Sequence, residues 1–306
     1  MTDFQQFLKN GFIIGSIVIA LIYFLPQLFS PIISKKNNYV AATIDKENRL
    51  KNLKSPKIII IGGSGSAFSI DSKKIEDSLK MPVVNMAVAY GVGLGYMLEE
   101  VKGNINEGDK ILLIPEYYLP LAGNKKLMTL LSAINPEASN YMKISFLEKI
   151  ELAVVNFQRV GSSLFYYLKS NIKADDSNTR ESFNTYGDIV SHLNQPNQRP
   201  LKDQEILYKA LYTNELNHLN AFYKLAKEKK ADIIYSFPAY PINEYNKNKE
   251  AILFLEYRLK QKYIGQLANQ PKENLYNESH FFDTVYHLNG QAREKRTEYL
   301  ISLLKK

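Results

Sequence analysis

Ser64, Asp283 and His287 are the residues of this chain whose types and spacing could together perform acyl transfer. Ser64 lies in the segment Gly62-Gly63-Ser64-Gly65, directly after four isoleucines at 58–61. A run of β-branched residues predicts a buried strand, and the glycines predict the sharp turn that ends it. At the carboxyl edge of a parallel sheet, such a turn directs a hydroxyl into a cleft. The sequence therefore proposes Ser64 as a nucleophile.

A base and an orienting carboxylate for this hydroxyl come from near the other end of the chain. His287 lies in a loop that runs into a predicted helix, which suits it to deliver an imidazole to the sheet edge. Asp283, four residues earlier, could orient that imidazole and stabilise its protonated form. The amides of Ser64 and Gly65 would lie near the start of the next helix, where they stabilise developing negative charge. The alternative is that Ser64 only caps a helix or fills a turn. The remaining histidines are expected in polar surface positions: His192, His218 and His280.

Strand and helix patterns alternate through the rest of the chain. The predicted strands are 57–61, 82–86, 109–114 and 232–237, with a short fifth candidate at 275–276. The predicted helices are 72–79, 93–102, 203–230 and 291–304. This alternation implies an α/β fold, a parallel sheet with helices on both faces. It is interrupted at about 117–202, where a helical stretch (143–168) and a polar loop are interpreted as an insertion that borders the cleft or contacts a partner.

Composition and spacing exclude other kinds of chemistry. The chain has 306 residues and no cysteine, which excludes thiol catalysis and thiolate metal ligands. No His, Asp and Glu cluster has metal-ligand spacing, so neither a metal nor a cofactor is expected. Gly63 and Gly65 also resemble the start of a dinucleotide-binding turn, but Phe68 occupies the third glycine position and Asn85 replaces the acidic residue after the second strand. The net charge of +8 comes mostly from dispersed lysines, so nucleic acid is not an expected partner.

An uncharged apolar segment near the N-terminus predicts a membrane anchor. Residues 12–29 contain no charged side chain, and with residues 30–33 the segment is about as long as a bilayer-spanning helix requires. No small-x-small cleavage pattern follows it, which favours a retained anchor over a cleaved signal peptide. We interpret residues 1–34 as the anchor and residues 35–56 as a juxtamembrane linker with room for a short helix. Lys9 before the span and Lys35-Lys36 after it slightly favour a cytoplasmic main domain.

Together these motifs resemble the SGNH (GDSL-like) hydrolase superfamily, most closely its membrane-anchored members in the O-acylation of cell-envelope polymers. The Gly-x-Ser turn after the first strand matches residues 62–64. An Asn that closes the second strand, with a glycine soon after it, matches Asn85 and Gly91, whose amide is an oxyanion donor in the family. The last motif, an Asp and a His just before the final helix, matches Asp283 and His287.

The resemblance implies a three-layer α/β/α sandwich with a flavodoxin-like parallel sheet over residues 57–306. It implies a serine esterase or O-acyltransferase that acts on an envelope glycan or a lipid-linked polymer. It also implies a single-pass protein of the cytoplasmic (inner) membrane whose main domain faces the periplasm or cell exterior, opposite to the orientation that the lysines favour. The implied partners are the lipid bilayer, the glycan substrate and a multi-pass membrane O-acyltransferase.

Two features depart from the family pattern. The usual spacing is Asp-x-x-His, whereas three residues separate Asp283 from His287. The family offers an Asn after the third strand as an oxyanion donor, and this chain has Glu116 and Tyr117 there. Glu116 cannot donate a hydrogen bond while ionised, and Tyr117 could donate only with its hydroxyl turned inward.

Four residues therefore stand as oxyanion or substrate-binding candidates: Gly65, Gly91, Glu116 and Tyr117. The missing Asn and the long insertion also favour a different class of function. In that alternative the chain is a non-catalytic envelope assembly or interaction protein on a degenerate hydrolase scaffold.

Overall fold

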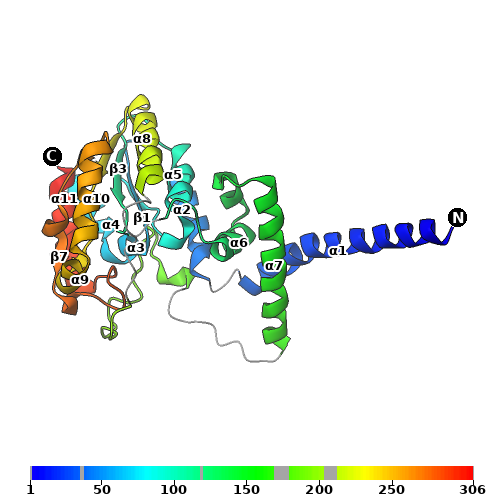
Figure 1. Cartoon of the computed structure of the whole chain (residues 1–306). Helices are drawn as coiled ribbons and strands as arrows, with labels where there is room; N and C mark the ends of the chain where they lie inside the picture. Colours follow the sequence, from blue (N-terminus) through cyan, green and yellow to red (C-terminus); the bar gives the residue numbers. More distant parts are fainter. Residues whose placement is uncertain (1, 35–37, 118–119, 169–178, 203–211, 306) are drawn as a thin grey trace.

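Five parallel strands form the central sheet, in the order β2-β1-β3-β4-β6 (Figure 1). They are β1 (Ile58–Gly62), β2 (Val83–Asn85), β3 (Lys110–Ile114), β4 (Asp232–Tyr235) and β6 (Gln266–Leu267). The first strand lies inside the sheet and the order reverses beside it, as in flavodoxin-like folds. The structure is a computed structural model that describes residues 2–34, 38–117, 120–168, 179–202 and 212–305.

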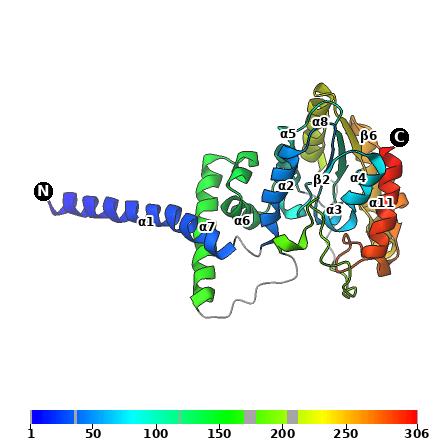
Figure 2. The ribbon, with the colours of Figure 1, turned by 180° about the vertical axis from the view of Figure 1, so that it is seen from behind.

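Helices cover both faces of this sheet, which confirms the predicted α/β class (Figures 1 and 2). One face packs against α4 (Ser72–Leu79) and α11 (Gly290–Leu304). The other packs against α2 (Ala42–Asn52), α5 (Leu94–Lys102), α8 (Tyr212–Glu228) and α10 (Lys249–Lys262). The remaining helices near the sheet are α3 (Ser64–Ser69), η2 (Tyr90–Val92), α9 (Ile242–Lys247), η5 (Pro271–Asn274) and η6 (Glu278–His280).

The isoleucine run of β1 explains why this strand is central. Ile58 and Ile60 belong to the core beneath α4 and α11, while Ile59 and Ile61 belong to the core on the opposite face. Successive side chains of a strand point to opposite faces, so only a strand covered on both sides needs an uninterrupted apolar run.

The fifth strand of the sheet differs from the prediction. Residues 275–276 do form a short strand, β7 (Leu275–Tyr276), but it pairs with β5 (Tyr240–Pro241) in a separate two-stranded sheet. The fifth position of the main sheet belongs to β6. Two-residue strands carry too little hydrophobic pattern for the sequence to place them.

The predicted linker is instead part of the folded domain. Its described residues form η1 (Tyr39–Ala41) and α2, and Val40 and Ala41 are completely buried. Lys46 of α2 is buried too, and its ammonium donates hydrogen bonds of 2.5–2.8 Å to three backbone carbonyls, those of Asn85, Ala87 and Gly187. Burial lowers the pKa of Lys46 to about 7. The polar composition of this segment thus reflects one solvated helix face, not a free linker.

The N-terminal segment forms one long helix, α1 (Asp3–Ser34), that projects from the rest of the molecule (Figures 1 and 2). The most apolar stretch within Asp3–Pro26 has a mean hydropathy of 2.0 and is exposed. An exposed helix of this length and composition can cross a membrane.

The insertion divides into two parts. Its first part forms α6 (Lys125–Ile134), η3 (Pro136–Tyr141) and α7 (Phe146–Leu168), and packs against α1 (Figure 1). Its second part, 179–202, includes η4 (Arg180–Ser182) and runs back to the sheet, where Lys202 forms a parallel bridge with Thr284. The first part thus connects the anchor to the sheet domain, and the second part, which carries Asp188 and His192, borders the candidate site.

Candidate active site

Ser64 is the first residue of α3, directly after the turn that ends β1. The turn residue Gly63 lies against the carboxyl group of Glu116: a Cβ at position 63 would approach its atoms to 2.7–2.8 Å. A Cβ at Gly62 would lie 2.5 Å from the carbonyl oxygen of Ile114. Both glycines are therefore required for the close approach of this turn to the end of β3.

The structure brings Ser64, His287 and Asp283 into one hydrogen-bonded chain. The Ser64 hydroxyl lies 2.9 Å from Nε2 of His287, and Nδ1 of His287 lies 2.7 Å from Oδ1 of Asp283. An ionised Asp283 accepts the Nδ1–H hydrogen bond, which leaves Nε2 unprotonated to accept from the Ser64 hydroxyl. The His287 and Asp283 side chains are only 9% and 14% exposed, so this contact is shielded from solvent.

A tight hairpin accounts for the Asp-x-x-x-His spacing. The backbone N–H of Phe282 donates to the carbonyl of His287 at 2.7 Å, and Phe281 pairs with Leu288. Residues 283–286 therefore form a closed four-residue loop; Asp283 is its first residue and His287 directly follows it, so the two lie side by side across the hairpin. The extra residue is absorbed by the loop, and the expected contact between carboxylate and imidazole is present.

The pKa of the Asp283 carboxyl is below its usual value. Burial opposes its ionisation, but the hydrogen bond from His287 and the nearby charge of Lys202 outweigh that effect. Asp283 is thus an ionised acceptor at neutral pH, as an orienting residue must be.

Aromatic contacts that the sequence did not predict hold the imidazole in place. The Phe68 ring stacks on His287, with ring centroids 3.7 Å apart and an interplanar angle of 3°. Phe68 also contacts His192, which packs against Phe282. His192 is buried, contrary to its predicted surface position, and burial lowers its pKa to about 4. It is therefore a neutral packing residue whose Nε2–H donates to the carbonyl of Leu288 at 3.0 Å.

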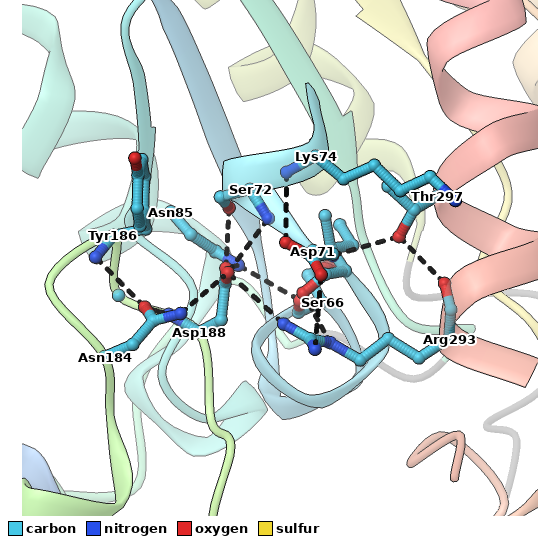
Figure 3. A network of polar contacts seen from close by, with 12 residues as sticks. Ser66, Asp71, Ser72, Lys74, Asn85, Asn184, Tyr186, Asp188, Arg293 and Thr297 are labelled. Atoms are coloured by element: carbon cyan, nitrogen blue, oxygen red, sulfur yellow. Dashed lines mark hydrogen bonds and ion pairs between the residues drawn. The ribbon is translucent and has the colours of Figure 1, made fainter. Parts of the chain in front are cut away.

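Behind α3, a buried polar network centred on Asp188 fixes the nucleophile turn (Figure 3). Asp188 accepts hydrogen bonds from the backbone and hydroxyl of Ser72 and from the amide of Asn85. It also forms an ion pair with Arg293 of α11. The Asn85 amide donates in turn to the carbonyl of Ser66, two residues after the nucleophile. This network joins α3, α4, α11 and the insertion, and it assigns Asn85 a supporting role.

Glu116 follows β3, at the place where the resemblance expects an Asn that donates to the oxyanion, and its carboxyl group lies against the nucleophile turn. Its Oε1 accepts the Gly65 amide hydrogen at 2.7 Å and lies 3.3 Å from the Ser64 hydroxyl. Its Oε2 is buried and has no hydrogen-bond partner in the described part of the chain. Burial raises the pKa of Glu116 to about 7, an effect that the bonds from Gly65 and Ser64 only partly offset. The sequence predicts that the Gly65 amide is available to an oxyanion. In the structure this amide is bound to the Glu116 carboxyl group.

The other two oxyanion candidates lie elsewhere. Gly91 is in η2 and lines a separate cavity with Tyr39 and Leu127. No contact joins Gly91 to Ser64 within the described residues, because the loop after β2 turns toward α6. Tyr117 is a core residue whose ring packs edge-on against Tyr240 with centroids 5.1 Å apart. The structure thus places Gly91 against Leu127 of α6 and the Tyr117 ring in the core, since short motifs do not specify the path of the loop that follows a strand.

No protein-family model matches this chain, and a search of curated proteins found no significant match. Among the described residues, no group of three or more His, Cys, Asp or Glu side chains is arranged to hold a metal ion. The described site is a serine hydroxyl, an imidazole and an ionised carboxylate in sequence, beside a backbone amide bound to a buried carboxyl group. That set can transfer an acyl group through a covalent serine ester.

Proposed function

We propose that this chain is a membrane-anchored, SGNH-like serine esterase or O-acyltransferase that acts on a cell-envelope glycan or lipid-linked polymer. The observation that carries the proposal is the hydrogen-bonded chain from Ser64 through His287 to Asp283. Unrelated surface residues rarely give one imidazole two such partners, one at each ring nitrogen, at the carboxyl end of a parallel strand.

The chemistry follows from these contacts. Ser64 Oγ attacks the ester carbonyl while His287 Nε2 takes its proton, and Asp283 stabilises the imidazolium. Collapse of the tetrahedral intermediate releases the alcohol, which receives the proton from His287 and leaves an acyl group on Ser64. Water or a glycan hydroxyl then attacks the acyl-serine, with His287 again taking and returning the proton.

Glu116 must leave the Gly65 amide before that amide can stabilise an oxyanion. Protonation of Glu116 weakens its hold, because a neutral carboxyl group is a poorer acceptor than a carboxylate. It also removes a negative charge from the place where the oxyanion forms. Glu116 therefore links activity to pH.

The membrane location rests on α1, and the outward-facing orientation rests on the family resemblance. A bilayer anchor would hold the site near lipid-linked polymers and near a multi-pass O-acyltransferase that supplies acyl groups. The acyl group then passes to water or to a glycan hydroxyl, whichever reaches the acyl-serine. Water gives an esterase and the glycan gives an O-acyltransferase.

A fluorophosphonate probe tests the proposal on the full chain in detergent or native membranes. Wild-type protein is expected to be labelled at pH 6, where Glu116 is mostly protonated. Ser64→Ala should abolish labelling. Ser66→Ala is the matched control, because Ser66 lies in the same helix but donates to the carbonyl of Ile114, away from His287. Folded wild type that remains unlabelled would overturn the catalytic assignment.

The bond between Glu116 and the Gly65 amide favours a second candidate, a non-catalytic envelope assembly or interaction protein. In that case the carboxyl group permanently closes the site and stabilises the turn. Absence of probe labelling, together with specific co-purification of an envelope protein from native membranes that survives Ser64→Ala, would support it.

A further inference from the structure

The helix α7 presents an apolar strip that the other described residues do not cover. Four large apolar side chains near its start are exposed: Phe146 (75%), Leu147 (76%), Ile150 (48%) and Val154 (37%). Their spacing of one, four and eight residues places them on one side of a helix, within an arc of about 100°. Water is an unfavourable surrounding for such a strip, so its position in the fold indicates what covers it.

Two acidic residues near the start of α7 have polar partners and lie outside the apolar strip. Glu151 forms an ion pair with Lys125 of α6 at 2.6 Å, and Glu148 accepts hydrogen bonds from the backbone and hydroxyl of Ser145. The four residues of the strip carry no charge, and the exposed charged residues Lys149 and Glu151 lie on its two flanks. This segregation is typical of helices that lie in a membrane interface.

The helix α7 lies crosswise against α1, and the two helices are in contact (Figures 1 and 2). In the part of α1 from residue 20 to residue 29, the described side chains that the protein covers or partly covers are Ile22, Leu25, Pro26 and Phe29. Their spacing of three, four and seven residues defines one face of α1, and α6 and α7 are the elements packed against it. If α1 runs across the bilayer, α7 runs parallel to its surface.

The position of this contact along α1 determines the depth of α7. Residues 12–29 of α1 carry no charge, so the contact at 22–29 falls inside the uncharged span. The nearest charge on the far side is Lys9, and from Lys9 to Ile22 the helix rises only about 20 Å, against about 30 Å of hydrocarbon. The remaining thickness, about 10 Å, must lie at the level of α7. Interfacial helices are typically buried by about 5–10 Å, which matches this remainder.

We infer that α7 is an interfacial helix whose strip of Phe146, Leu147, Ile150 and Val154 inserts into the lipid bilayer beside α1. The occupant of the strip is lipid, not a partner protein, because the length of the uncharged span requires hydrocarbon at this level. With α1 across the bilayer and α7 along its surface, the protein contacts the membrane through two helices at right angles. Two such helices hold the domain more firmly than one, so the insertion sets the orientation of the sheet domain. The inference rests on α1 spanning the membrane and is independent of the chemistry at Ser64.

Single-cysteine labelling of the full chain tests this inference, because the chain contains no native cysteine. Ile150→Cys carries an environment-sensitive fluorophore in protein reconstituted alone into phosphatidylcholine–phosphatidylglycerol vesicles. Tyr257→Cys, on an exposed site of α10, is the aqueous control, and Ile14→Cys, exposed on α1, is the membrane control. Circular dichroism verifies that each labelled variant retains its helical content.

The label at 150 is expected to shift to shorter emission wavelength and to be quenched by lipids that carry a nitroxide near the headgroup end of the acyl chain. The label at 14 should be quenched more by a nitroxide deeper in the chain, and the label at 257 by neither. A label at 150 that behaves like the one at 257 while position 14 is in lipid would overturn the inference and leave the anchor intact. A label at 14 that is also in water would overturn both. Because no other protein is present, quenching at 150 cannot come from a protein partner.

Discussion

Glu116→Gln replaces the carboxyl group on the Gly65 amide by a group of the same shape that cannot ionise. Glutamine retains a carbonyl oxygen that can accept from Gly65. Its amide nitrogen would take the place of Oε2, which has no hydrogen-bond partner in the described part of the chain. A buried amide nitrogen without an acceptor costs about 1–3 kcal/mol of folding free energy, and this cost is the same at every pH. The diagnostic quantity is therefore the pH dependence of the stability difference between the variant and the wild type.

The magnitude follows from the pKa of Glu116. Burial raises it from 4.5 to about 7 in the folded protein. The folded state therefore holds this proton more tightly than the unfolded state. The associated stability is fully present below pH 4.5 and is lost as pH rises to about 7. A shift of this size corresponds to about 3 kcal/mol. Between pH 4.5 and pH 8, Glu116→Gln should gain that amount relative to wild type.

Thermal unfolding of the full chain in detergent, followed by circular dichroism, measures this difference. The melting temperature of the variant minus that of wild type should rise by roughly 5–10 °C between pH 4.5 and pH 8. A constant difference across this range would refute the reasoning, because it would mean that Glu116 does not change its charge in the folded protein. Glu100, which is buried with its pKa raised to about 8, remains in both proteins and cancels.

Activity provides a second measurement on the same variant. At pH 8 about one tenth of a group with pKa near 7 remains protonated, so wild-type ester hydrolysis should fall about tenfold per pH unit above 7. Glu116→Gln should lack this alkaline decline. Glu100→Gln is the matched control: Glu100 contacts the hydroxyl of Tyr96, and its replacement should leave the decline unchanged.

Three further outcomes are expected. Asp283→Asn should retain the fold by circular dichroism but lower turnover of an activated acetyl ester by about four orders of magnitude, because the imidazole is held in the wrong tautomer; an unchanged rate per folded molecule would leave a Ser–His dyad. Phe68→Leu retains apolar bulk but removes the flat face against His287, and should lower kcat about fivefold, as expected for an aromatic contact of about 1 kcal/mol, with little change in KM. Protease added to intact spheroplasts should digest the main domain, residues 35–306; digestion only after lysis would place the domain in the cytoplasm, as the lysine distribution favours.

Some of this structure could be predicted from local sequence, because the relevant forces act between residues close in the chain. The isoleucine run predicted β1, and the predicted helix at 72–79 has the same bounds as α4. The uncharged span at the N-terminus predicted the exposed helix α1. Residue type and position beside a strand end or a helix start were enough to nominate Ser64 and His287.

The spacing between Asp283 and His287 illustrates where local reasoning stops. The sequence showed one residue more than the family pattern, and only the hairpin closed by Phe282 shows that the loop absorbs it. The contact depends on a backbone hydrogen bond across a turn, and no residue in the segment specifies that bond by itself. His192 was misplaced for the same reason: a polar neighbourhood in sequence became a buried, stacked ring in space.

Tertiary structure alone decided what surrounds the nucleophile. The sequence offered four candidates, Gly65 from its place at a helix start, Gly91 from the family resemblance, and Glu116 and Tyr117 from their place after the third strand. Packing moved Gly91 toward α6 and Tyr117 into the core, and it brought Glu116 onto the Gly65 amide. Glu116 contacts Ser64 and Gly65, which lie more than 50 positions away in the sequence. Its burial, its hydrogen bonds and its pKa therefore depend on the tertiary fold. The sequence specifies which groups are available, and the distances between distant strand ends decide which of them meet.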